Sequence, residues 1–132
     1  MANALPSRLH QIAQHADDLD RAARFYGDVL GFRLIAEFDP PGMRFFDLGN
    51  VRLLLERSAP SAILYLEVGD IAAAHSALAA DGVEFVAAPH MIHRDDDGLF
   101  GPPGSEEWMA FLRDTEGNVV ALVERRASRT SE

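Results

Sequence analysis

The stretch that decides the fold spans residues 18–32 and reads DLDRAARFYGDVLGF. Its apolar residues recur at i, i+3, i+4, i+7 and i+11, which is the spacing of an amphipathic helix with one buried face: Leu19, Ala22, Ala23, Tyr26 and Leu30. Asp18 or Asp17 is suited to accept hydrogen bonds from the first free N–H groups of this helix. Gly31 suits the left-handed turn that follows a helix end.

A weaker copy of this pattern follows at an offset of 52 residues, where VGDIAAA at 68–74 aligns with ADDLDRA at 16–22. Asp70 and Gly82 delimit the second helix in the same way. Apolar runs separated by turn residues predict the strands around both helices: 9–16, 32–38, 43–48, 51–56, 61–68, 83–88, 107–112 and 119–124, with a long polar excursion over 89–105. The predicted order is β-α-β-β-β, twice.

This order and two motifs resemble the vicinal oxygen chelate (glyoxalase/bleomycin resistance protein/dioxygenase) superfamily. Residues 18–31 follow the pattern D-L-x-x-A-x-x-F-Y-x-x-V-L-G, and FLRDTEGN at 111–118 resembles the closing F-x-D-P-x-G-N hairpin. The resemblance covers roughly residues 9–124. It implies an α+β fold in one domain, with two βαβββ units (8–57 and 61–124) that form a curled mixed sheet around a cavity. We expect the tail, 125–132, to be flexible.

Composition excludes several classes of protein. The chain has 132 residues, no cysteine and no lysine, which excludes disulfides, thiolate nucleophiles and Schiff-base chemistry. Its net charge of -9 disfavours binding to nucleic acid or to anionic membranes. No apolar run is long enough to span a bilayer, and the N-terminus does not resemble a secretion signal, so we expect a cytoplasmic protein. The resemblance implies a homodimer.

The resemblance also implies four strand positions that hold a metal ion in many relatives. They fall on Gln11, Leu54, Ile63 and Ala121 in this chain. Three of these four side chains carry no ligand atom, whereas a divalent ion needs three or more oxygen or nitrogen ligands. We therefore expect no metal cofactor at the usual positions.

A different polar set is predicted on the cavity side of the strands by the alternation of strand residues. His15, Glu56, Tyr65 and Glu67 are the candidates for proton transfer, and His15 and Glu67 occupy equivalent places in the two units. Gln11, Arg52, Leu54, Ile63 and Ala121 are candidates for substrate contacts, with Arg52 holding an anionic group. Either the histidine and the glutamate meet as an acid–base pair, or they form a salt bridge at the cavity mouth.

The excursion 89–105 is longer than a hairpin needs, which is typical of lids and binding loops. His90 and His93, with Glu107 or Asp95–Asp97 nearby, form an alternative, relocated metal site, against the simpler interpretation of an acidic surface loop. Trp108 is predicted to pack in the core or to stack on a planar ligand.

Two functions compete on this basis. The first is a glyoxalase-like lyase or isomerase that removes a proton next to a carbonyl group of a small metabolite without the usual metal. The second is a non-catalytic protein of the bleomycin-resistance type that binds or sequesters a small molecule, with acidic charge favouring a cationic ligand. A ring-cleaving dioxygenase is disfavoured, because the iron triad would fall on Leu54, Ile63 and Ala121.

Overall fold

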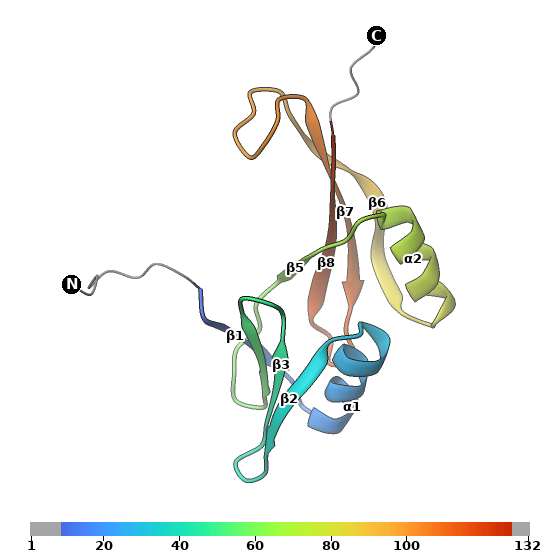
Figure 1. Cartoon of the computed structure of the whole chain (residues 1–132). Coiled ribbons are helices and arrows are strands. Elements are labelled where there is room, and N and C mark those ends of the chain that lie inside the picture. The colour runs from blue at the N-terminus through green and yellow to red at the C-terminus, as the bar shows by residue number, and fades with distance from the viewer. Residues whose placement is uncertain (1–8, 128–132) are drawn as a thin grey trace, which may run out of the picture. The chain divides into compact units, whose positions relative to one another are not determined.

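The computed structural model describes residues 9–127 and divides into two compact units between Ala62 and Ile63. Each unit has one helical segment and a four-stranded mixed sheet, in the order β-α-β-β-β (Figure 1). The α+β class and the repeated unit predicted from the sequence are therefore confirmed.

The first unit builds its helix as the capping pattern predicts. The Asp18 carboxylate accepts a hydrogen bond from the Arg21 N–H at 3.0 Å, and helix α1 (Leu19–Arg24) follows. The helix then widens into a π-helical turn, η1 (Phe25–Val29), before Gly31 leaves it with a φ of +81°. Positive φ is costly for a residue with a Cβ atom, which explains the glycine at this place.

The sheet of the first unit has the order β1-β4-β3-β2, with β1 parallel to β4. Its strands are β1 (Gln11–His15), β2 (Arg33–Phe38), β3 (Met43–Asp47) and β4 (Arg52–Glu56). One face packs on the helix, since the ring of Tyr26 lies 6.3 Å from that of Phe46, and Leu53 and Leu55 are fully buried beside it. Because neighbours in a strand point to opposite faces, Arg52, Leu54 and Glu56 belong to the other face, which we call the helix-distal face.

The second unit repeats this plan with the strand order β5-β8-β7-β6. Its elements are β5 (Leu64–Glu67), α2 (Ile71–Ala80), β6 (Glu84–Asp95), β7 (Ser105–Arg113) and β8 (Val119–Arg126). The Asp70 carboxylate accepts from the Ala73 N–H at 3.1 Å, as the cap prediction requires. The Glu124 carboxylate also accepts from the Ile71 N–H at 2.8 Å, which ties the start of α2 to β8.

Strand alternation in the second unit follows the predicted faces. Leu64 is 3% exposed and its neighbour Tyr65 is 57% exposed. Leu64 pairs with Val120, which pairs in turn with Leu112, and all three are buried on the helix side. Tyr65 pairs instead with Ala121 on the helix-distal face.

The C-terminal ends of two strands lie two or more residues beyond the prediction. Strand β6 runs to Asp95, so the loop between β6 and β7 contains only residues 96–104 and both histidines of the excursion lie in a strand. Strand β8 runs to Arg126, so Arg125 and Arg126 belong to the sheet and not to a tail. Residues 128–132 of the predicted tail lie outside the described residues. No helix within 9–127 is long and apolar enough to cross a membrane.

Candidate functional site

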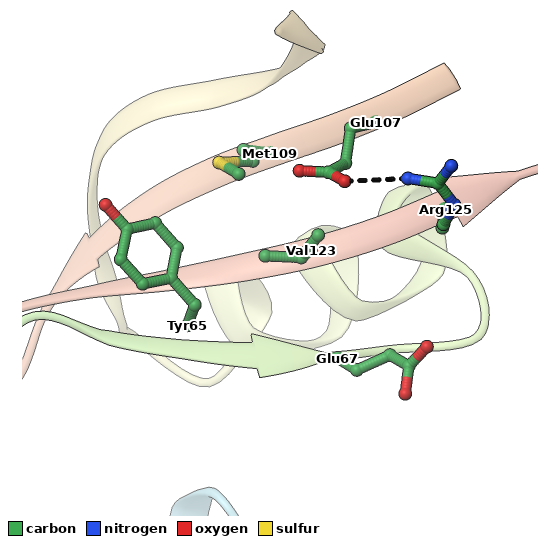
Figure 2. Close-up of a pocket in the computed structure, with 6 residues that line it drawn as sticks. All are labelled: Tyr65, Glu67, Glu107, Met109, Val123 and Arg125. Atoms are coloured by element: carbon green, nitrogen blue, oxygen red, sulfur yellow. Dashed lines mark hydrogen bonds and ion pairs between the residues drawn. The ribbon is translucent and has the colours of Figure 1, made fainter. Parts of the chain in front are cut away.

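A hollow on the helix-distal face of the second sheet is the candidate site. Its volume is about 320 Å³, and it is lined from three adjacent strands by Tyr65, Glu67, Glu107, Met109, Val123 and Arg125. Figure 2 shows these six side chains on one side of the sheet with the helix behind it. Met109 and Val123 are register partners and form an apolar floor beside the Arg125–Glu107 pair. The volume falls at the lower end of the range of small-molecule pockets.

One arginine organises the polar end of this hollow. Arg125 donates from Nη1 to Glu107 at 3.0 Å and from Nη2 to Asp95 at 2.6 Å. Burial opposes ionisation of Asp95, but hydrogen bonds from the N–H groups of Phe100 and Leu99, and then Arg125, outweigh it and lower the pKa of Asp95 to about 2. We call these three side chains the Asp95–Arg125–Glu107 triad, in which the lowered pKa keeps Asp95 ionised at neutral pH.

The four residues predicted for proton transfer come from both units. In the first unit, His15 and Glu56 are register partners on β1 and β4, and His15 Nε2 lies 3.0 Å from a carboxylate oxygen of Asp17. In the second unit, Tyr65 and Glu67 line the hollow. An approach of His15 to Glu67, which would join residues of the two units, stays a prediction.

The predicted metal positions do not fit a divalent ion. The Gln11 side-chain oxygen accepts from Arg52 Nε at 3.0 Å and from Arg52 Nη2 at 2.7 Å, so a guanidinium cation already occupies this acceptor. Leu54 and Ala121 are buried, and Ile63 is exposed, but none of these side chains carries a donor atom. Among residues 9–127, no group of three or more His, Asp or Glu side chains is placed to hold a metal ion.

Arg52 is an exposed cation on the first unit's helix-distal face. Its guanidinium carbon lies 5.3 Å from the centre of the Phe45 ring, in addition to its two bonds with Gln11. A guanidinium over an aromatic ring gains electrostatic attraction, which helps to hold Arg52 in place. The predicted role of Arg52 in holding an anionic group stays a prediction.

The relocated metal site predicted from His90, His93 and Glu107 is not assembled. His93 is the register partner of Glu107, but the Glu107 carboxylate is bound by Arg125. His90 Nδ1 lies 2.8 Å from the backbone oxygen of Ala88. The three side chains do not form one of the clusters that can hold an ion.

Trp108 lies on the face that packs on the helix. It is two residues from the buried Ala110 and therefore shares its face, whereas the neighbouring Met109 points to the helix-distal face. The guanidinium carbon of Arg126 lies 3.9 Å from the centre of the Trp108 ring, and the indole N–H donates to Glu106 at 2.8 Å. Trp108 therefore does not join the residues that line the hollow.

Two important residues of the hollow are not predicted from the sequence as part of a small-molecule site: Arg125 is assigned to the tail, and Asp95 is considered only as a possible metal ligand within 95–97. Arg125 continues the series Val119, Ala121, Val123 on one face of β8, so alternation could have placed it once the strand was extended. Asp95 is the first of three consecutive aspartates, and nothing in the sequence distinguishes the buried one from its two exposed neighbours.

Comparisons with known proteins identify the family. The model of the Glyoxalase/Bleomycin resistance protein/Dioxygenase superfamily matches residues 8–122. A glyoxylase-like domain-containing protein of Didymella fabae is 29% identical over 127 residues, which cover 83% of this chain and 88% of that protein.

Two solved structures are similar to this chain. A lactoylglutathione lyase from Agrobacterium tumefaciens is 28% identical with a TM-score of 0.66, over 91% of this chain and 95% of that one. An antibiotic binding protein from a Streptomyces species is 22% identical with a TM-score of 0.66, over 93% of this chain and 98% of that one. The family match covers most of the chain, and with the repeated βαβββ fold it shows that this protein belongs to the Glyoxalase/Bleomycin resistance protein/Dioxygenase superfamily.

Proposed function

We propose that this protein reversibly binds a small organic cation on the helix-distal face of its second sheet, without a resident metal ion. The observation that carries the proposal is the hollow lined by Tyr65, Glu67, Met109, Val123 and the Arg125–Glu107 pair. It combines an apolar floor with an excess of negative charge.

The charge excess follows from the residues of the hollow and its neighbour Asp95. The hollow and its neighbour hold three carboxylates, of Glu67, Glu107 and Asp95, and one guanidinium, of Arg125, which leaves a net charge of -2. Arg125 is shared by two carboxylates, whereas the Glu67 carboxylate makes no hydrogen bond or ion pair with any residue from 9 to 127. Glu67 is therefore the carboxylate available to a ligand, and the net charge of -9 attracts cations toward it.

The apolar part of the hollow suits an aromatic ligand. The Tyr65 ring is more than half exposed beside Met109 and Val123. A cation over an aromatic face gains electrostatic attraction, and a thioether packs well against rings. The antibiotic binding relative with the same fold supports a binding role for this architecture.

Dye binding to chelator-treated protein tests the proposal. Thioflavin T, an aromatic cation, is expected to bind with a saturable rise in fluorescence, and 8-anilinonaphthalene-1-sulfonate, an aromatic anion, is expected to bind more weakly. Glu67→Gln should weaken thioflavin T binding by up to about fivefold, because a rim carboxylate contributes about 0.2–1 kcal/mol to an ion pair. Asp81→Asn removes an exposed charge elsewhere in the second unit and is the matched control. Equal binding of both dyes, or no effect of Glu67→Gln, would contradict the proposal.

Acid–base catalysis is the second candidate, and the observation that favours it is the His15–Asp17 pair. A carboxylate at 3.0 Å from Nε2 orients the imidazole, and Glu56 is the register partner of His15. The 28% identity with a lactoylglutathione lyase supports lyase or isomerase chemistry. Turnover of any substrate found by screening should then be lost in His15→Ala and fall in Glu67→Gln, whereas recovery of the compound unchanged supports binding alone.

A cytoplasmic location and a homodimer are part of this proposal. Both come from the sequence and the family resemblance. Light scattering of the purified chain tests the dimer, since a mass of 14.5 kDa would contradict it.

A further inference from the structure

Loop 96–104 presents two large apolar side chains to solvent although its backbone is firmly held. Leu99 is 76% exposed and Phe100 is 71% exposed. Figure 1 shows this loop, in orange, at the end of β6 and β7 that lies away from α2. Exposed apolar side chains that cluster on a protein surface commonly mark a binding site.

Asp95 holds the loop in this shape. Its carboxylate is 2% exposed and accepts from the N–H groups of Leu99 at 2.8 Å and Phe100 at 2.9 Å. Its backbone oxygen accepts from the N–H groups of Gly98 and Gly104. The backbone that carries Leu99 and Phe100 is thus fixed at both residues and at both ends of the loop.

Arg125 joins this loop to the hollow. The same guanidinium that lines the hollow donates to Asp95 and to Glu107. The loop also lies directly on it, because a Cβ atom at Gly101 would be only 2.9 Å from Arg125 Nη2. On the Glu107 side, Phe100 approaches His93, the register partner of Glu107, with ring centres 6.3 Å apart.

We propose that Leu99 and Phe100 contact the far end of an elongated aromatic cation whose charged end lies in the hollow, with Asp95 and Arg125 as positioning residues. This inference rests on the proposed function and adds the ligand's shape to it. A compact cation fits the hollow of about 320 Å³ alone, whereas a longer one extends past Arg125 to the loop. A loop ordered in advance avoids the entropy cost of ordering on binding, which is the physical benefit of holding two apolar side chains exposed.

The test compares two cations of different length on the same variants. Thioflavin T is the elongated probe, followed by fluorescence, and benzyltrimethylammonium is the compact probe, followed by calorimetry. The double variant Leu99→Ser/Phe100→Ser should weaken thioflavin T binding at least about fivefold, as expected for apolar anchors of an interface. It should leave benzyltrimethylammonium binding within about twofold. Met91→Ser, an exposed apolar residue that pairs with Trp108 on the helix-side face, is the matched control and should change neither affinity.

Asp95→Asn keeps the side chains of Leu99 and Phe100 but weakens the hydrogen bonds that hold their backbone. It should lower the affinity for thioflavin T more than the affinity for benzyltrimethylammonium. Equal affinities of the double variant and wild type for thioflavin T overturn the inference and leave the proposed function intact. Equal losses for both probes also overturn it, because they indicate general damage to the hollow. No binding of either cation to wild-type protein overturns the proposed function and the inference together.

Discussion

Replacing Gly101 by alanine probes the contact between the loop and the hollow. The added Cβ atom would lie 2.9 Å from Arg125 Nη2 and 3.0 Å from Nε, about half an ångström inside an ordinary contact of about 3.5 Å. An arginine end usually moves aside, but here Asp95 and Glu107 hold both terminal nitrogens. Either the loop or the triad must shift, and overpacking of this kind costs about 1–3 kcal/mol.

Urea unfolding followed by the fluorescence of Trp108 measures this cost, because the only tryptophan belongs to the second unit. Gly69→Ala is the matched control: no atom lies within 4 Å of the added Cβ, so the free energy of unfolding should stay within about 0.5 kcal/mol of wild type. In an Asp95→Asn background the guanidinium loses one charged partner, so the cost of Gly101→Ala should shrink. If the Gly101→Ala protein were as stable as wild type, the claim that Asp95 and Glu107 prevent the Arg125 guanidinium from moving would be refuted.

Three further predictions concern the core, the triad and the metal positions. Leu112→Ala, at a fully buried residue on the helix side, should lower the free energy of unfolding by about 2–5 kcal/mol in the same assay, and a cost below 1 kcal/mol would contradict the assigned face. The pKa of Asp95 is about 2 in the folded protein against an ordinary 3.8, so its contribution to stability is complete above pH 3.8 and is lost as pH falls toward 2. Unfolding measured across that range should therefore depend less steeply on pH in Asp95→Asn, and identical slopes would count against the triad. Protein incubated with Zn²⁺, Ni²⁺ or Mn²⁺ and desalted should retain far less than one equivalent of metal by elemental analysis, because Arg52 already binds the Gln11 side-chain oxygen. Retention of one equivalent would contradict this prediction.

Local patterns predicted the repeated unit because capping and strand alternation act over a few residues. Asp18 and Asp70 cap their helices, and Leu64 and Tyr65 point to opposite faces, as the sequence indicates. The end of β6 could not be predicted in this way, because its last residues before Asp95 are exposed on both faces and show no apolar alternation.

The candidate site was predicted only in part for a related reason. Tyr65 and Glu67 follow from alternation on β5, but the partners of Arg125 depend on which strands lie side by side and on their register. A charge run such as 95–97 looks like a solvated turn until the fold buries one member. Tertiary contacts, and not local sequence, select Asp95.

A heteronuclear NMR titration of the chelator-treated protein with thioflavin T tests the central proposal most directly. Binding on the helix-distal face of the second sheet predicts saturable shifts of the amide signals of Tyr65, Glu67, Met109 and Val123, extending to Leu99 and Phe100, with the first unit's Leu53 and Phe46 unchanged. Unchanged signals along β5, β7 and β8, or shifts that appear only after a divalent metal is added, would contradict a metal-independent cation site at this hollow.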